Sequence, residues 1–507
     1  MVTKCMFRSR SRRLRHLFGG GALALLLTAG CAVGPDYEAP EPDLPDAWEN
    51  AAAADVVGET PVILDWWSAF NDPLLDDLIR RAGEGNLDLA AAVGRIAEAR
   101  AYHRITGGDR WPQAGLSGAV DRTEVPSDYW PGGENPATNW EFGLGASWEI
   151  DIWGKVRRSR EASGAALDAS VEDYRDVLVS LYAEVATTYM EVRTYQARLA
   201  FAHDNAKSQR ETLDVVSARE DAGLVPLLDV ARARSNLANT EAAIPQLEIA
   251  LEVARNRLAI LVGVIPGSLD QELTQGGGMP APQMDLAVSL PAELMRRRPD
   301  IRRSERNLAA QTARIGVATA DLYPSFSLTG ALTLMAPDFG SLGDDGAFGW
   351  SLGSDFKWNL FTGGKIRGQI QVEEARTEQL LAAYEKTVLS ALAEVENSLV
   401  SLRQEEMRRD LLQVASESAQ QSVELVHTQY ISGLTDFQNY LDAQRTLSNQ
   451  QDQLATSRGQ VLANLINLNR ALGGGWSLDD PVPGLTPPAD TPETASIEPT
   501  ATEEEGR

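Results

Sequence analysis

The chain has 507 residues, 43% of them hydrophobic, so it is long and apolar enough to bury a large core. Its 46 Lys and Arg against 72 Asp and Glu give a formal net charge of -26, which excludes a protein that binds along nucleic-acid phosphates. The two Cys and four His include no pair at metal-ligand spacing, which excludes a disulfide scaffold, a zinc site and a thiol redox centre. We therefore expect no metal and no cofactor held in a pocket.

Residues 1–30 are predicted to be a lipoprotein signal peptide. They contain six basic residues and no acid, and an apolar run extends from Leu17 to Leu27. This run is too short to span a bilayer as a helix, so we expect the segment to be removed. Residues 27–31, LTAGC, resemble the lipobox of bacterial lipoproteins, in which the cysteine becomes the first residue of the mature chain.

Cys31 is therefore the predicted lipidation site, and a diacylglycerol with an N-acyl chain is the one attached group that we expect. The alternative is an ordinary cleavage site beside a free cysteine, but an exported free thiol would be a liability. In such lipoproteins Ala32, in place of an acid, implies sorting to the outer membrane. Residues 31–62 are rich in Pro, Ala and Asp and are expected to form an extended segment behind the anchor.

Most of the remaining chain is one unit written twice, in residues 63–275 and 286–475, with 276–285 as the linker. The clearest matches share an offset of 210 residues. They are GKVR at 154–157 with GKIR at 364–367, AEV at 183–185 and again at 393–395, and GL at 223–224 and again at 433–434. A constant register over such a distance favours duplication over chance similarity of two helical halves.

Each repeat contains a predicted β-hairpin after a short helix, at about residues 113–152 and 325–361. Apolar residues occupy every even position from Trp140 to Ile152, with polar residues or glycine between them, which is the period of a strand. These strands exceed the usual globular length and match the roughly ten residues that cross a bilayer when tilted. The alternative, a half-buried sandwich, is disfavoured by the long helical stretches between the hairpins.

Long helices are predicted over 156–222 and 227–262 in the first repeat, and over 365–431 and 436–472 in the second. At 1.5 Å for each residue, a helix over 156–222 would be about 100 Å long, which excludes a compact globule. Apolar residues from Tyr174 to Leu199 step alternately by four and three, the period of a left-handed coiled coil.

Glycines end the first long helix of each repeat, and the chain then turns back, so both breaks are predicted hairpin tips. Pro245, which has no counterpart in the second repeat, should kink or split the returning helix of the first. Residues 476–507 hold several prolines and an acidic run and are predicted to be a disordered tail.

Four strands cannot close a barrel, and open strand edges are not tolerated in hydrocarbon, so several chains must share one barrel. Two copies would give eight strands with a filled interior, whereas three would give twelve and begin to leave a lumen. We therefore predict an α+β membrane protein. It is a homotrimer in which a 12-stranded transmembrane β-barrel continues into a long coiled-coil helical barrel.

The sequence resembles the TolC-type outer-membrane efflux proteins, specifically the lipoprotein branch called NodT or outer-membrane factor. The motifs that carry the resemblance are CAVGPDY at 31–37, WW at 66–67, DPL at 72–74, RPDI at 298–301, LFTGG at 360–364 and LDAQR at 441–445. The resemblance implies a passive outer-membrane exit duct that extends into the periplasm and exports small toxic compounds or drugs. It also implies docking on a periplasmic adaptor that serves an inner-membrane RND-type transporter.

In that family the helix tips form a closed periplasmic gate. The resemblance places Asp442 in a ring of three aspartates on the threefold axis, and it pairs Asp229 with Tyr430 as a latch. Thr435 stands where some members have a latch arginine, and Asn439 where some have a second ring aspartate. The exposed tips are expected to dock the adaptor through Gly223, Leu224, Gly433 and Leu434.

Two other functions remain open from the sequence. The duct could serve type I protein secretion, with the same pore and a different pump, or the chain could be a non-porous, lipid-anchored coiled-coil structural protein. An enzyme is not expected, because the sequence has no nucleophile elbow, no phosphate-binding glycine loop and no His beside a plausible nucleophile.

Overall fold

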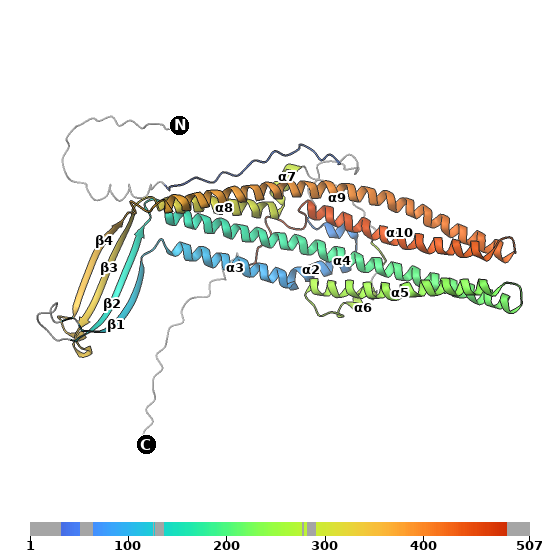
Figure 1. Ribbon diagram of the computed structural model, residues 1–507, viewed down its shortest axis with the longest axis horizontal. Helices are drawn as coiled ribbons and strands as arrows, with labels where there is room; N and C mark the ends of the chain where they lie inside the picture. Colours follow the sequence, from blue (N-terminus) through green and yellow to red (C-terminus); the bar gives the residue numbers. More distant parts are fainter. Residues whose placement is uncertain are drawn as a thin grey trace, which may run out of the picture. The chain divides into compact units, whose positions relative to one another are not determined.

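The computed structural model describes residues 32–50, 64–124, 126, 136–275, 278–280 and 291–483. The predicted signal peptide, Cys31, most of the linker and everything after residue 483 lie outside these ranges. In chain order the elements (Figure 1) are the 3-10 helix η2 (Trp66–Phe70), α2 (Pro73–Gly85), α3 (Leu87–Gly108), β1 (Gln113–Thr123), β2 (Ala137–Ile150), α4 (Lys155–Asp221), α5 (Leu227–Val262), α6 (Asp270–Gln275), α7 (Pro291–Arg297), α8 (Pro299–Ala320), β3 (Ser325–Ala336), the 3-10 helix η4 (Phe339–Gly343), β4 (Phe348–Lys357), α9 (Lys365–Ile431) and α10 (Phe437–Ala471).

The chain divides into two compact units, which we describe separately. The strand unit holds the described part of Met1–Ala39 together with Arg100–Ala166 and Asn307–Leu381. The helix unit holds the described parts of Pro40–Ala99, Leu167–Arg306 and Ala382–Arg507.

The strand unit is built on one antiparallel sheet with the strand order β1-β2-β3-β4. The register places Leu116 opposite Leu144, Leu144 opposite Leu332 and Leu332 opposite Trp350, which forms one apolar row across all four strands. The neighbouring row consists of Ser117, Gly143, Thr333 and Gly349. Because side chains alternate between the faces of a sheet, one face is apolar and the other is polar or small. The apolar face is exposed in the single chain, with Leu116 at 79% and Trp350 at 72%.

Tryptophans tie the ends of the strands to the helices at matching places in the two halves. The Trp148 indole donates a hydrogen bond to the Arg110 carbonyl at 3.0 Å, and the Trp358 indole donates one to the Leu322 carbonyl at 3.1 Å. Trp153 stacks on Tyr323 with ring centroids 4.6 Å apart. The two indole hydrogen bonds occupy matching places, so each hairpin is anchored to the helix before it in the same way, whereas the Trp153–Tyr323 stack joins the two halves.

The first described residues pack at one of these junctions. The Val33 amide donates a hydrogen bond to the Trp153 carbonyl at 3.0 Å, and the Arg158 guanidinium donates to the Val33 carbonyl and pairs with Asp36. Gly34 has a φ of 89° and packs directly on the backbone of Gly316, so a side chain at either position would collide with its neighbour. The segment behind Cys31 is therefore held against the start of α4.

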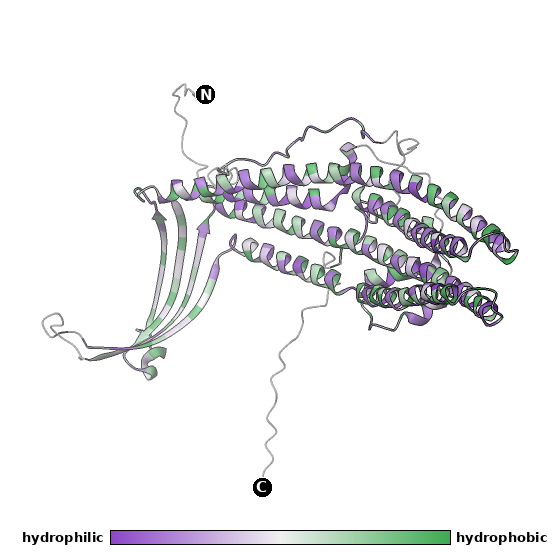
Figure 2. Ribbon diagram, turned by 45° about the vertical axis from the view of Figure 1, so that its right-hand side comes forward, coloured by the Kyte–Doolittle hydropathy of each residue, from purple (hydrophilic) through white to green (hydrophobic). Residues whose placement is uncertain are grey.

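The helix unit contains α5 and α10 and the larger part of the long helices α4 and α9, from Leu167 and from Ala382 onward. α4 and α9 have 67 residues each, and α5 and α10 have 36 and 35. The apolar row predicted on α4 is buried inside the chain at Tyr174, Leu181, Val185 and Val192. Hydrophobic and hydrophilic residues interleave along every long helix (Figure 2). Among the described residues, no helix combines the length and apolarity that a membrane span requires.

The structure corrects two predictions in part. α5 runs through Pro245 without a break, so the returning helix is not split, because a missing hydrogen bond in a 36-residue packed helix leaves its other contacts in place, and a kink there stays a prediction. The prediction of a disordered tail is wrong for residues 476–483, since Trp476 and Val482 are buried, and the rest of the predicted tail lies outside the described residues. The Trp476 indole donates to the Arg297 carbonyl at 3.0 Å, and the Arg175 guanidinium lies 4.6 Å from its ring centroid. This packing orders the segment as far as residue 483.

Candidate functional site

Both helix-hairpin ends are closed by the same glycine turn. The Gly223 amide donates to the Glu220 carbonyl and the Leu224 amide to the Arg219 carbonyl, and Gly433 and Leu434 repeat this pattern after α9. Gly223 has a φ of 69° and Gly433 a φ of 70°, a left-handed conformation that glycine adopts without strain. The turns leave Leu224 and Leu434 at 68% and 79% exposed. The four residues predicted to dock a partner are thus at the surface of the tips.

An aromatic cluster joins the two hairpin ends, although they are about 210 residues apart in the sequence. Tyr430 lies 5.3 Å from Phe437 and 6.1 Å from Tyr440, measured between ring centroids. The buried members of the cluster are Val216, Val230, Ala233, Tyr430, Phe437, Tyr440 and Leu441. They come from α4, α5, α9 and α10, so this cluster holds the ends of all four helices together within one chain.

The expected latch pair is close but not bonded within one chain. The Tyr430 hydroxyl has no hydrogen-bond partner among the described residues, and Asp229 instead approaches Arg232 at 3.8 Å. The Arg219 guanidinium lies 5.0 Å from the Tyr430 ring centroid. Burial raises the pKa of Tyr430, the Arg219 charge acts against this, and the Asp229 charge adds to it. Sequence reasoning missed Arg219, although its position in the last turn of α4 favours a cation near the helix end.

The other predicted gate residues lie on the first turns of α10 and the turn before it. The Gln438 amide donates to both carboxylate oxygens of Asp442, at 3.0 and 3.1 Å, and Arg445 lies 3.7 Å away. The Asn439 amide donates to the Thr435 hydroxyl at 2.9 Å. The Asp442 side chain is more than half exposed, so it is free to face other charges.

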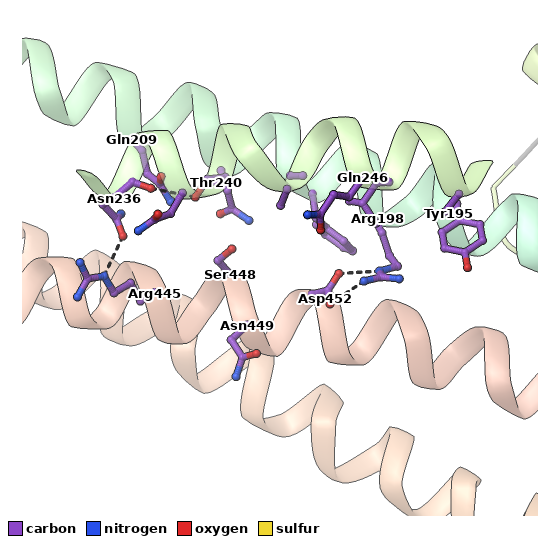
Figure 3. Close-up of a pocket in the computed structure, with 17 residues that line it drawn as sticks. Tyr195, Arg198, Gln209, Asn236, Thr240, Gln246, Arg445, Ser448, Asn449 and Asp452 are labelled. Carbon is purple, nitrogen blue, oxygen red and sulfur yellow. Dashed lines mark hydrogen bonds and ion pairs between the residues drawn. The ribbon is translucent and has the colours of Figure 1, made fainter. Parts of the chain in front are cut away.

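A polar cavity of about 620 Å³ follows the aromatic cluster along α4, α5 and α10 (Figure 3). Arg198 pairs with Asp452 across it, and the Arg445 guanidinium donates to the side-chain amide oxygen Oδ1 of Asn236 at 2.9 Å. The side-chain oxygen Oε1 of Gln209 and the side-chain nitrogen Nδ2 of Asn236 are buried without a hydrogen-bond partner in the described chain. Because buried polar groups normally find partners, this stretch of the helix contact is loosely packed. No sequence period predicts this cavity, because it forms where three helices meet.

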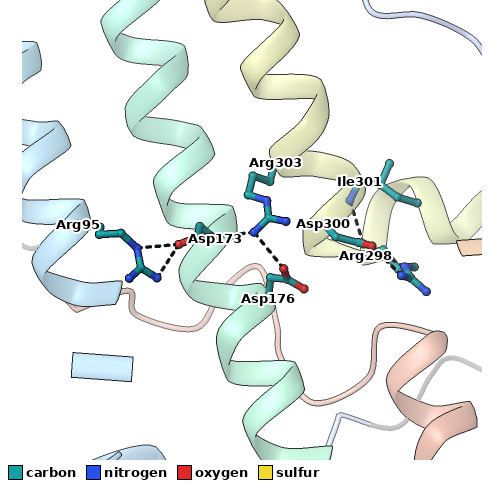
Figure 4. Close-up of polar contacts among 7 residues, drawn as sticks. All are labelled: Arg95, Asp173, Asp176, Arg298, Asp300, Ile301 and Arg303. Atoms are coloured by element: carbon teal, nitrogen blue, oxygen red, sulfur yellow. Dashed lines mark hydrogen bonds and ion pairs between the residues drawn. The ribbon is translucent and has the colours of Figure 1, made fainter. Parts of the chain in front are cut away.

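Away from the tips, an ion-pair network ties α3, α4 and α8 together (Figure 4). Asp173 accepts from Arg95 at 2.8 Å and from Arg303 at 2.7 Å, and Asp176 lies 3.1 Å from Arg303. Burial alone would raise the pKa of Asp173, but the two guanidinium groups together hold it below its ordinary value. Burial dominates at Asp176 and raises its pKa.

The RPDI motif has a structural role beside this network. The Arg298 guanidinium makes a two-pronged pair with Asp300, contacts Glu394 at 2.8 Å and donates to the Ala471 carbonyl. Although burial acts to lower it, the hydrogen bonds and charges of Asp300 and Glu394 raise the pKa of Arg298 above its ordinary value. Pro299 occupies the first position of α8, where no amide hydrogen is needed.

We expect Asp173→Asn to lower the free energy of unfolding by about 1 to 2 kcal/mol at neutral pH, because two charged hydrogen bonds are lost. This contribution should be present above pH about 4 and fade as the pH falls through the lowered pKa of Asp173. Asp176→Asn is the matched control. Because burial raises the pKa of Asp176, its charged form is disfavoured in the folded chain at neutral pH, so removing this charge should leave the free energy of unfolding unchanged or slightly higher.

Thermal unfolding followed by circular dichroism between pH 3 and 8 measures both variants. Equal destabilisation by the two substitutions would contradict the assigned pKa directions.

Three comparisons with known proteins bear on this geometry. A family model described as outer membrane efflux protein matches residues 78–264 and 290–474. The chain is 33% identical over 457 residues to nodulation protein T of Rhizobium leguminosarum bv. trifolii, which covers 89% of the chain and 96% of the relative. It is 29% identical over 465 residues to the antibiotic efflux pump outer membrane protein ArpC of Pseudomonas putida, covering 90% and 95%. The solved structure of the outer-membrane channel OprN is similar with a TM-score of 0.82 and 34% identity, over 88% of this chain and all of that one.

Proposed function

The chain belongs to the outer membrane efflux protein family, and we propose that three copies of it form one passive exit duct through the outer membrane. In this proposal the strands of the three copies make a 12-stranded barrel and the long helices make a tube in the periplasm. Cys31, outside the described residues, carries the lipid anchor. No reaction takes place, and the walls of the duct determine what passes.

The four-stranded sheet carries this proposal. Its apolar face is exposed, and within the described residues β1 and β4 each have one edge without a neighbouring strand. An exposed apolar face is stable in lipid, but unpaired backbone groups in hydrocarbon each cost several kcal/mol. Further copies that pair β4 of one chain with β1 of the next satisfy both requirements, and three copies of four strands make twelve.

The helices support the same assembly. On α9 the exposed apolar residues include Met407, Leu411 and Val414, which step by four and three. On α5 the exposed Ile249, Val253 and Ile260 follow the same period. A 3.5-residue apolar row is the contact face of a coiled coil, and these rows are distinct from those buried within the chain. They fit helices of neighbouring copies.

Two observations support the proposed internal repeat. The family model matches two separate stretches, 78–264 and 290–474. The paired helices have equal lengths, 22 residues in α3 and α8 and 67 in α4 and α9. The differences between the halves, such as Pro245, then mark places where the copies have diverged after duplication.

The tips are the proposed gate and docking site. Three copies would bring three Asp442 carboxylates around one axis, where their mutual repulsion favours cations and disfavours a tight closed state unless other contacts hold it. We assign the role of holding the closed state to Tyr430 and Asp229. Within one chain the charge of Asp229 already helps to raise the pKa of Tyr430. Leu224 and Leu434 offer apolar anchors to a periplasmic adaptor linked to an RND-type pump. The name of ArpC, an antibiotic efflux pump component, supports small toxic compounds as the exported class.

Leu389 tests the assembly, since it lies on the exposed row of α9 at 66% exposure. We expect Leu389→Asp to break the trimer, because burying a leucine contributes about 1.5 to 3 kcal/mol at each contact and a buried unpaired carboxylate is costlier. Ser390→Asp, at the next exposed position, places the same charge off the row and should leave the trimer intact. Light scattering after size-exclusion chromatography gives the mass, and a trimeric Leu389→Asp variant would speak against the helical contact.

Tyr430→Phe tests the gate in planar bilayers. Wild-type protein should be nearly silent, and the variant should conduct, because it removes the latch hydroxyl while leaving the ring in the aromatic cluster. Tyr440→Phe is the control, since Tyr440 shares the cluster but its hydroxyl faces Thr212 at 3.4 Å.

Equal currents from Tyr430→Phe and wild type would rule out the latch. No current from any variant, Asp229→Ala included, would count against a pore altogether.

A further inference from the structure

We propose that the chain binds the phosphate headgroups of anionic phospholipids in the periplasmic leaflet of the outer membrane, through a basic cluster where α3 meets β1. The inference rests on the proposed duct, which places the strands in that membrane. The basic cluster consists of Arg100, Arg104, Arg110 and Arg160, with His103 and Trp111, around a hollow of about 490 Å³. No Asp or Glu lines this hollow.

The charge of the basic cluster is uncompensated. None of its four arginines forms an ion pair with a residue that the structure describes, whereas Arg95, Arg157 and Arg158 close to them in sequence each have a carboxylate partner. On a chain with a net charge of -26, an acid-free group of four guanidinium groups is a local exception. Like charges held together repel, so the cluster is completed by an anion from outside the chain.

Contacts within the strand unit also indicate where the basic cluster lies relative to the first described residues and to the start of β1. Val33, two residues after Cys31, bonds to Trp153 directly before α4, and Arg160 follows in the second turn of that helix. At 1.5 Å for each residue, Arg160 lies about 10 Å along the chain from this contact. Arg110 precedes the first residue of β1 by only three positions. The cluster therefore lies where the lipid anchor leaves the chain and the first strand begins.

Tryptophan at this level favours a lipid over a soluble anion. Trp111 is 72% exposed beside the arginines, and the indole of Trp148, on the apolar face of β2, donates a hydrogen bond to the Arg110 carbonyl. Exposed tryptophans gather at membrane interfaces, where the ring lies among the headgroups. Arginine stems cover apolar surface at the same depth while their guanidinium groups reach the phosphates.

The second half of the chain has the same junction without the charge. α3 and α8 match at equal length, and this places Thr312, Gly316 and Leu322 where the first half has Arg100, Arg104 and Arg110. The matching of α4 with α9 puts Ile370 in place of Arg160. The tryptophan contact is nevertheless kept, from Trp358 to Leu322. The junction folds without arginines, so they serve another purpose.

The test compares lipid binding of the full-length protein, purified from membranes in detergent, with that of two triple variants. The first, R100Q/R104Q/R160Q, removes three of the four arginines of the basic cluster. The matched control, R80Q/R210Q/R234Q, removes three exposed arginines elsewhere on the helices. Native mass spectrometry measures retained phosphatidylglycerol and phosphatidylcholine, and a titration of phosphatidylglycerol into phosphatidylcholine micelles gives the affinity.

We expect wild type and control to prefer phosphatidylglycerol and the first variant to lose roughly fivefold in affinity for each arginine removed. Equal preference in all three proteins, or no preference in wild type, would overturn the proposal. Displacement of the lipid by inorganic phosphate at matched concentration would overturn it in favour of a soluble-anion site. Bilayer conductance of the Tyr430→Phe and Asp229→Ala variants is recorded in parallel. A conducting protein without lipid preference refutes this inference alone, whereas the absence of conductance from every variant counts against the duct.

Discussion

The unpaired edges of the four-stranded sheet are the constraint on which the rest of the account depends. A strand edge presents backbone donors and acceptors that water can satisfy and hydrocarbon cannot. The sheet nevertheless exposes an apolar row, Leu116, Leu144, Leu332 and Trp350, that water disfavours. Neither environment suits a single copy. In a closed ring of copies every strand edge would be paired and the apolar face would contact lipid. The exposed rows on α5 and α9 would then pack against helices of the neighbouring copies.

Local sequence periods predicted the elements but not the contacts between them. Strict alternation from Trp140 to Ile152 predicted most of β2, which runs from Ala137 to Ile150. The unbroken helical pattern and the glycine that follows it predicted α9, which runs from Lys365 to Ile431. These signals are local, because backbone geometry and solvent exposure act on neighbouring residues. Arg219 over Tyr430, the Asp173 network and the ordered Trp476 join segments far apart in the chain, and no period records them. At the candidate site, the family resemblance named Asp229 and Tyr430, whereas the structure shows that one chain alone leaves the hydroxyl unbonded.

The kind of packing changes along the helix unit, and this affects how a gate at the tips can open. Its tips are joined by aromatic packing around Tyr430, the next stretch holds a polar cavity, and the region of Asp173 and Arg298 is tied by ion pairs with short contacts. Elements that move are expected to have few buried apolar contacts beside them, whereas a scaffold is densely bonded. The loosely packed stretch separates the tips from the ion-pair network, so a change at the tips need not disturb the network.

Cross-linking between copies tests the threefold closure most directly. The chain has only Cys5, in the predicted signal peptide, and Cys31, which we expect to be acylated, so introduced cysteines should be the free thiols of the mature protein. One cysteine on β1 and one on β4, scanned over both strands, should yield three linked chains on a denaturing gel at the paired positions, and a ladder that stops there. Linked pairs alone, a ladder that continues beyond three, or a single unlinked chain at every position would contradict the account.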